Sequence, residues 1–401
     1  MRQGKPDLCK QVDRYPTVAL VLQGGGALGG YQCGVYEGLH DAGIRPNWFA
    51  GISIGAINAA ILAGNAPEDR LDKLRGFWEL IAEPGGNFSL PALATRSAVA
   101  AFPDETELLA WARGMSAFGA LLQGQRGFFE PRLLSPFLFS DGSPQATSFY
   151  DTTPLLDTLE RFVDFDRINR DRSVRLTVGA TGITRGNFRY FDSALEKIRP
   201  QHIIASGALP PAFPAVEIEG EWYWDGGIVS NTPLEYILDC RPHEDTLVLQ
   251  VDLWSAHGEA PRTMMDVLER MKDIRFSSRT RHGTQMVEVA QKLRTSLKEL
   301  IAHLPDRTLP PHLQDALAPY LDDRVFNIIH LIYQSKTHEQ QHKDYAFGRI
   351  PLREHWDSGL ADMSSTLERP EFFALPDRDI GVATHDVHRL ARRRRKSRVK
   401  G

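Results

Sequence analysis

The chain has 401 residues, of which 42% are hydrophobic and 24% are charged, and its formal net charge is −4. This composition excludes a disordered chain, and three cysteines (Cys9, Cys33 and Cys240) are too few and too far apart for a disulfide-stapled scaffold or for a metal or redox motif. The length allows one large domain with an extension, or two domains.

The first elements repeat a strand, a turn and a helix. Residues 1–16 form an N-terminal arm without the apolar segment of a signal peptide. Residues 17–23 are a continuous apolar run typical of a buried parallel strand, and a glycine-rich turn and a helix over residues 31–42 follow. A second strand over residues 48–52 runs into Ser53, and residues 54–62 have helical composition.

Residues 85–150 interrupt this pattern with an irregular segment that is rich in proline, glycine and phenylalanine. Its phenylalanines are Phe88, Phe102, Phe118, Phe128, Phe129, Phe137 and Phe139. A long aromatic insertion is typical of a lid or binding loop, and an auxiliary hydrophobic core is the alternative.

The α/β pattern resumes after the insertion. Apolar runs at residues 174–181, 202–206, 222–224 and 246–253 predict further strands. Strands interleaved with helices indicate an α/β sheet, and we place one domain over residues 17–255.

The remaining residues have a different sequence pattern. Residues 264–271 and 286–301 have the apolar period of two amphipathic helices, residues 325–333 predict a strand, and residues 356–367 predict another helix. Residues 256–388 contain no recognisable catalytic set, so we interpret them as a mainly helical extension for packing or partner binding.

Residues 389–401 form a basic tail with eight basic residues and no acidic one, so the rest of the chain sums to −12. Such a tail suits contact with an anionic membrane, while a solvated, disordered end is the alternative. A nucleic-acid-binding protein is expected to have a basic body as well, so we expect no nucleic acid. No apolar run reaches the roughly 18 residues of a membrane span, and we expect a cytoplasmic protein with at most peripheral membrane contact.

Residues 51–55 spell Gly-Ile-Ser-Ile-Gly, a G-x-S-x-G pattern between a predicted strand and a predicted helix. In a sharp strand-to-helix turn, this spacing exposes the hydroxyl of Ser53, and Gly51 and Gly55 permit the strained backbone. The N-terminus of the following helix adds a positive dipole end near the reacting atom. These features make Ser53 a candidate nucleophile.

A second glycine-rich turn, Gly24-Gly25-Gly26-Ala27-Leu28-Gly29, follows the first strand directly. Consecutive glycines let backbone N–H groups point into one concavity, which suits an oxyanion hole or a phosphate cradle. The turn also fits the G-x-G-x-x-G dinucleotide fingerprint, but that motif needs an acidic residue at the end of the second strand, where this chain has Ser53. A P-loop is excluded because no Gly-Lys-Ser/Thr follows.

The third motif is Asp225-Gly226-Gly227, at the end of an aromatic strand. An Asp-Gly pair is common in simple turns. An aspartate there can also act as the general base for a serine if it is aimed at the hydroxyl and partly desolvated.

Together these motifs, with Asn231-Thr232-Pro233 and residues 205–214 (ASGALPPAFP), resemble the patatin-like phospholipases over residues 17–255. The resemblance implies a three-layer α/β/α fold with a mostly parallel sheet, and a Ser53–Asp225 dyad without histidine or cofactor. Gly24, Gly25 and Gly26 would form the oxyanion hole. The residues after 255 resemble an extension found in a bacterial branch of the family.

The resemblance also implies a lipid acyl hydrolase of the phospholipase A type. The family usually has Arg or Lys where this chain has Leu28, which leaves a neutral ester or a hydroxyalkanoate polyester as an alternative substrate. A Ser-acid-His triad with His243, His257 or His282 is a further alternative, and so is a lipid- or partner-binding scaffold with vestigial chemistry.

Overall fold

The computed structural model describes residues 8–83, 122–240, 244–303, 310–317, 323–335 and 343–388. In this part of the chain, a nine-stranded sheet has the order β11-β10-β9-β1-β2-β5-β8-β7, and β6 pairs with β5. Its strands are β1 (Thr17–Leu22), β2 (Trp48–Gly51), β5 (Arg175–Gly182), β6 (Phe188–Asp192), β7 (Val216–Ile218), β8 (Glu221–Asp225), β9 (Thr246–Asp252), β10 (Phe326–Ile332) and β11 (Val382–Asp386).

The pairs from β11 through β10, β9, β1 and β2 to β5 are all parallel. The pairs of β5 with β6, β5 with β8 and β7 with β8 are antiparallel. The sheet is therefore mostly parallel, as predicted. A separate two-stranded ribbon joins β3 (Glu130–Pro131) to β4 (Tyr150–Asp151).

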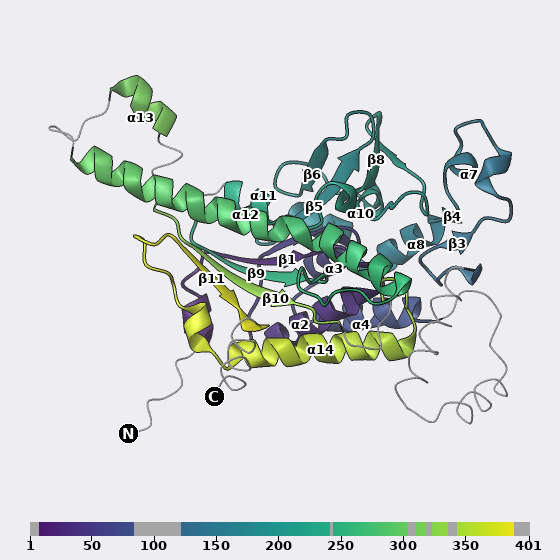
Figure 1. Ribbon diagram of the computed structural model, residues 1–401, viewed down its shortest axis with the longest axis horizontal. Helices are drawn as coiled ribbons and strands as arrows, with labels where there is room; N and C mark the ends of the chain where they lie inside the picture. Colours follow the sequence, from purple (N-terminus) through teal and green to yellow (C-terminus); the bar gives the residue numbers. More distant parts are fainter. Residues whose placement is uncertain are drawn as a thin grey trace.

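The helices of the described residues cover both faces of the sheet (Figure 1). They are α1 (Leu8–Val12), α2 (Gly29–Asp41), α3 (Ile54–Ala63), α4 (Arg70–Ile81), α7 (Pro144–Thr147), α8 (Thr153–Phe162), α9 (Phe165–Arg170), α10 (Pro200–Ser206), α11 (Leu234–Asp239), α12 (Met264–Ala302), α13 (Pro311–Leu317) and α14 (Arg349–Leu367).

Strand β1 shows why the fold has three layers. All six of its residues are buried, and alternate side chains enter different cores. Leu20 and Leu22 pack in the core that contains α2, α3 and α4, whereas Ala19 and Val21 pack in the core that contains α11. Because successive side chains of a strand point to opposite faces, a strand that is apolar throughout must be covered on both sides. The predicted three-layer α/β/α class is confirmed.

The residues after 255 take part in this sheet. β10 pairs with β9 in parallel over residues 326–332, and β11 pairs with the other edge of β10. On one face, α14 lies along α2 (Figure 1). Gly34 of α2 and Gly359 of α14 allow the contact, since a Cβ on either would lie about 2 Å from a backbone oxygen of the other helix. The segment expected as a mainly helical extension thus contributes two strands and a packed helix.

Two predictions of elements were wrong. Residues 202–206 belong to helix α10, which starts with Pro200 at its first turn and ends before Gly207. A five-residue apolar run does not distinguish a strand from a buried helix, and the proline at the start favours the helix. The two expected amphipathic helices are one helix, α12, whose N-terminus is closed by a capping box between Thr263 and Asp266.

Part of the aromatic insertion forms a core. Phe128 and Phe129 are buried and contact Phe213, and Phe129 also contacts Tyr150. Phe137 is 87% exposed. The auxiliary-core interpretation thus holds for Phe128 and Phe129. Phe88, Phe102 and Phe118 lie outside the described residues.

Within the described ranges, no helix is both long enough and apolar enough to cross a bilayer.

Candidate active site

Ser53 occupies a sharp turn between β2 and α3. Its backbone has φ 55° and ψ −125°, a positive φ that residues with a side chain rarely adopt. The flanking glycines make the turn possible: a Cβ on Gly51 would lie 2.1 Å from the Gly55 carbonyl oxygen, and a Cβ on Gly55 would lie 2.2 Å from that of Leu22. The G-x-S-x-G spacing therefore produces the predicted strand-turn-helix.

A buried serine holds the Ser53 turn from the side of α10. The N–H of Ser53 donates a hydrogen bond to Ser206 Oγ at 3.0 Å. The Ser206 hydroxyl in turn donates to the Gly179 carbonyl of β5 at 2.6 Å. This chain of bonds ties the turn to the neighbouring strand and helps to maintain the positive φ.

Asp225 ends β8 and is 3% exposed. Its N–H donates to the Ala208 carbonyl at 2.9 Å, and its carboxylate accepts the Gly227 N–H at 2.6 Å. Burial raises the pKa of Asp225 from 3.8 to about 6, although the hydrogen bonds from Gly227 and from the Ser53 side chain lower it. Ser53 and Asp225, 172 positions apart in the sequence, thus meet through their side chains.

The glycine-rich turn lies beside Ser53. A Cβ on Gly24 would lie 3.1 Å from Ser53 Cβ and 2.4 Å from Asn231 Oδ1, so this position has no room for a side chain. The Gly24 carbonyl accepts hydrogen bonds from Asn231 Nδ2 at 3.0 Å and from Trp254 Nε1 at 2.8 Å. The Gly24 N–H donates to the Asn231 carbonyl at 3.3 Å.

The amides of the next two residues of the turn differ from that of Gly24. Gly26 has φ 55°, and the N–H of Ala27 donates to the Asp344 carbonyl at 2.8 Å. The N–H groups of Gly25 and Gly26 donate no hydrogen bond to any part of the chain that the structure describes. Gly25 and Gly26 thus offer two adjacent backbone donors that have no partner among the described residues, in the turn that lies beside Ser53. Adjacent N–H groups of this kind suit a negatively charged oxygen.

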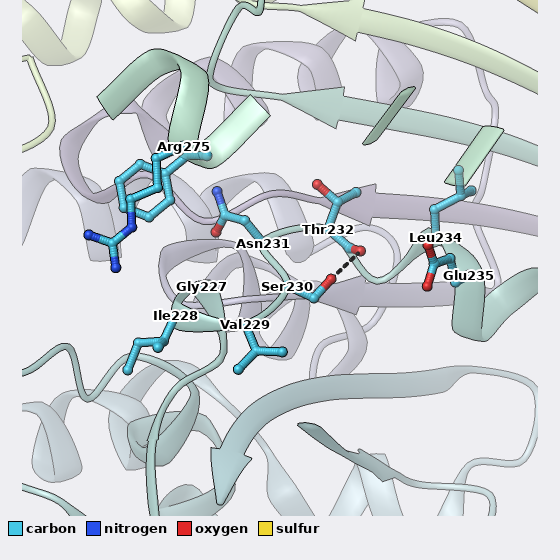
Figure 2. Close-up of a pocket in the computed structure, with 10 residues that line it drawn as sticks. Gly227, Ile228, Val229, Ser230, Asn231, Thr232, Leu234, Glu235 and Arg275 are labelled. Carbon is cyan, nitrogen blue, oxygen red and sulfur yellow. Dashed lines mark hydrogen bonds between the residues drawn. The ribbon is translucent and has the colours of Figure 1, made fainter. Parts of the chain in front are cut away.

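A pocket of about 110 Å³ lies over the segment from Gly227 to Glu235 (Figure 2). Gly227 and Asn231, which bond to Asp225 and Gly24, contribute to its wall. Arg275 of α12 and Glu235 of α11 lie at opposite ends of it in Figure 2. The pocket is therefore lined by residues from both sides of position 255, two of which bond to Asp225 and Gly24.

Sequence reasoning missed two residues of this site. Trp254 lies two residues after the end of β9, and its position after a parallel strand next to β1 was the available signal. Asp344 acts through its backbone carbonyl, which leaves no signal in the sequence. Leu28 is fully buried in the core that contains α2, so it faces away from solvent.

Comparison with known proteins places these features in a family. A family model described as patatin-like phospholipase matches residues 20–238, more than half of the chain. A second model, described as patatin phospholipase, matches residues 274–379. No match is found among curated proteins.

Several solved structures are similar to this chain. VipD from Legionella pneumophila shares 16% identity with a TM-score of 0.34, and the match covers 86% of this chain and 67% of that one. Human GIVD cytosolic phospholipase A2 shares 11% identity with a TM-score of 0.36, covering 92% and 62%. ExoU from Pseudomonas aeruginosa, in complex with SpcU, shares 18% identity with a TM-score of 0.27, covering 76% and 60%. The matches span about two thirds or less of those proteins.

Proposed function

Because the chain belongs to the patatin-like phospholipase family, we propose that it hydrolyses acyl esters of lipids, with Ser53 as nucleophile and Asp225 as general base. The observation that carries the proposal is the contact between a serine in a strained turn and a buried carboxylate whose pKa is raised to about 6. A base with a pKa just below neutrality is ionised at pH 7 and still accepts a proton effectively.

The proposed reaction has two stages. Asp225 accepts the hydroxyl proton as Ser53 Oγ attacks the acyl carbonyl carbon, and the resulting tetrahedral intermediate expels the alcohol, which takes that proton. Water then attacks the acyl-serine and gives a proton to Asp225. The second tetrahedral intermediate collapses, the proton returns to Ser53 Oγ, and the carboxylic acid is released.

The amides of Gly25 and Gly26 stabilise the oxyanion in both intermediates. Their N–H groups have no partner within the described residues, whereas the Gly24 N–H already donates to Asn231. Of the three oxyanion donors expected from the sequence, Gly24, Gly25 and Gly26, we therefore keep the last two. Gly24 is needed because its position has no room for a side chain. One oxyanion donor is worth about 10² to 10³ in rate.

The decisive experiment compares the parent with Ser53→Ala and Asp225→Asn on a series of chromogenic esters of varied chain length. Both variants should lose about 10³-fold or more in kcat and remain folded. A fluorophosphonate probe should label the parent and not Ser53→Ala. The exposed Ser364→Ala serves as the matched control. Parent-like activity or labelling in Ser53→Ala would refute the proposal, and a scaffold without chemistry would leave the parent unlabelled.

The triad alternative is tested by substituting each candidate histidine. His257 is exposed, His243 lies outside the described residues, and the side chain of His282 is likewise not described. A dyad enzyme should keep nearly all of its activity in each variant. A loss of about 10³-fold in any one of them would favour the triad.

A neutral ester is the second candidate substrate, and the observation that favours it is Leu28. Leucine is uncharged, so the glycine-rich turn carries no positive charge at this position. Assays on a phospholipid, a triacylglycerol and a hydroxyalkanoate oligomer, each with Ser53→Ala as blank, distinguish the substrates. A phospholipase should prefer the first by its kcat/KM.

We further propose that the basic tail, residues 389–401, holds the protein at anionic membranes. Its eight basic residues are the support for this proposal. Deletion of the tail should weaken binding to vesicles that contain phosphatidylserine, and salt should weaken binding of the parent. Unchanged vesicle binding after the deletion would show that the tail does not hold the protein at membranes.

A further inference from the structure

The glycine-rich turn is held at both ends by residues that come late in the chain. At one end, Trp254 Nε1 donates to the Gly24 carbonyl at 2.8 Å. At the other end, the Asp344 carbonyl accepts the Ala27 N–H at 2.8 Å, and it lies 2.1 Å from where a Cβ on Gly26 would be. The backbone at Asp344 therefore packs directly against Gly26, one of the two residues whose amides we assign to the oxyanion, and Trp254 packs against the other, Gly25.

Lys343, the residue before Asp344, is buried to an unusual degree for a lysine, with 1% of its side chain exposed. Its Nζ donates to Asp273 at 2.7 Å and to Glu269 at 3.2 Å, both on α12. The same ammonium lies 5.2 Å from the centre of the Trp254 ring, the ring that bonds to Gly24. Lys343 thus contacts the residue that holds one end of the turn.

Asp344 is fixed to the same helix by the opposite arrangement of charges. Lys272 Nζ donates to both carboxylate oxygens of Asp344 at 2.9 Å. Two successive residues of the turn-contacting segment therefore form crossed ion pairs with two successive residues of α12, Lys272 and Asp273. α12 also contacts the residue just before the turn, since the Phe276 carbonyl accepts a hydrogen bond from Gln23 Nε2 at 3.2 Å.

The charges of these five residues, Glu269, Lys272, Asp273, Lys343 and Asp344, largely cancel. They therefore influence the site by fixing the position of the glycine-rich turn rather than through an electric field. Lys343 faces two carboxylates, and Lys272 is paired with Asp344. Buried ion pairs add little net stability because desolvation offsets their attraction, but they fix one geometry in place of others. Backbone donors in an oxyanion hole must be held close to one geometry, because a small displacement costs much of their effect.

We propose that Lys343 and Asp344, held by Glu269, Lys272 and Asp273, act as a clamp that positions the Gly25 and Gly26 amides for the transition state. We call these five residues the 343–344 clamp. The inference rests on the proposed function and extends it: residues after position 255, where we expected only packing or partner binding, are positioning residues for the reaction.

The test uses the full chain and two single variants, Lys343→Met and Asp344→Asn. Each should lower kcat by about 10-fold to 10²-fold with little change in KM, because the ground-state ester makes little use of the oxyanion donors. The rate of fluorophosphonate labelling should fall in parallel, because phosphonylation passes through the same oxyanion site. Lys298→Met, which removes the exposed pair of α12 with Asp323, is the matched control and should behave as the parent.

A rescue distinguishes positioning from general loss of stability. The double variant Lys272→Asp with Asp344→Lys restores the pair with reversed charges and should recover most of the kcat lost in Asp344→Asn. Thermal melting reports whether each variant is folded at the assay temperature. Asp344→Asn keeps the size of the side chain, so it remains informative if Lys343→Met does not fold.

Two different failures remain separable. If the parent itself is not labelled at Ser53, the proposed function fails. If the parent is labelled, and folded clamp variants are labelled and turn over at the parent's rate, the clamp is overturned while the proposed function stands. Loss of activity that follows only the loss of folded protein, without rescue by the charge reversal, also overturns the clamp.

Discussion

Ser53 stores backbone strain at the point of the proposed chemistry. Its φ of 55° costs a residue with a side chain about 1 to 3 kcal/mol, and glycine is free of that cost. Ser53→Gly and Ser53→Ala should both be inactive, but Ser53→Gly should be more stable than Ser53→Ala by about 1 kcal/mol after the greater chain entropy of glycine is counted. Urea unfolding measures the difference. Equal or lower stability of the glycine variant would mean that the turn is not strained.

The raised pKa of Asp225 sets the acid limb of activity. The proposed base must be ionised, so kcat/KM should fall tenfold per pH unit below about pH 6, where the free enzyme's Asp225 becomes protonated. A pH profile on an uncharged ester measures this limb. A profile that stays flat down to pH 4.5 would contradict the role of Asp225, and the limb should keep its midpoint in Ser364→Ala.

The same pKa makes a prediction about stability. Folding raises the pKa of Asp225 from 3.8 to about 6, so the folded state binds this proton more tightly than the unfolded state. The contribution of this group to stability is therefore fully present below about pH 4, where Asp225 is protonated in both states, and is lost as the pH rises to about 6. At pH 8 the buried carboxylate costs about 3 kcal/mol. Asp225→Asn should therefore gain stability over the parent by up to that amount between pH 4 and pH 8. Denaturant unfolding at both pH values measures it, and a constant difference would contradict the burial cost.

The sequence pointed to the proposed reacting residues but not to the residues that hold the glycine-rich turn beside them. Ser53 and Asp225 were found because their side chains sit in glycine-bearing turns, which have recognisable spacing. Trp254 and Asp344 were missed because they act on the glycine-rich turn through a ring N–H and a backbone carbonyl. A backbone carbonyl is present at every residue, so only the folded chain reveals which one makes the contact.

At the scale of elements, the packing of α14 on α2 depends on glycine. A Cβ on Gly359 would lie 2.0 Å from the Tyr31 carbonyl oxygen. Gly359→Ala should destabilise the protein by about 2 to 3 kcal/mol, although alanine favours a helix over glycine by about 1 kcal/mol. Thermal or urea unfolding measures this change. Ser364→Ala on the exposed face of α14 is the control, and a stabilised Gly359→Ala would refute the close contact.

Element types were predictable where a run was long and bounded. β1, β2, β9 and β10 follow from largely apolar runs, because strands covered on both faces have no polar face. α10 was misread because five apolar residues fit either type. We expected two helices in place of α12 because the apolar period of the sequence weakens in the middle of this segment. A helix of 39 residues tolerates a weak turn once its ends are fixed.

For the whole molecule, the residues after 255 are needed to cover the sheet. Without them, β9 would expose an edge that pairs with β10 over seven residues, and the apolar side chains of Phe326 and Ile328 would leave their core. A chain that ends at residue 255 should aggregate or unfold without cooperativity, as size-exclusion chromatography and thermal melting would show. A chain that ends at residue 388 should fold as the parent. Cooperative melting with parental activity of the shorter chain would show that residues 1–255 are an independent domain.

The strand order also determines when the site can form during translation. β1 is made first but lies between β2 and β9, and its pairing with β9 waits until residue 252 has been synthesised. The contact of Asp344 with the glycine-rich turn waits longer still. During translation, Ser53 therefore leaves the ribosome long before the backbone around it can be locked. Under the proposed mechanism, a nascent chain should therefore hydrolyse no ester efficiently before residue 344 has left the ribosome.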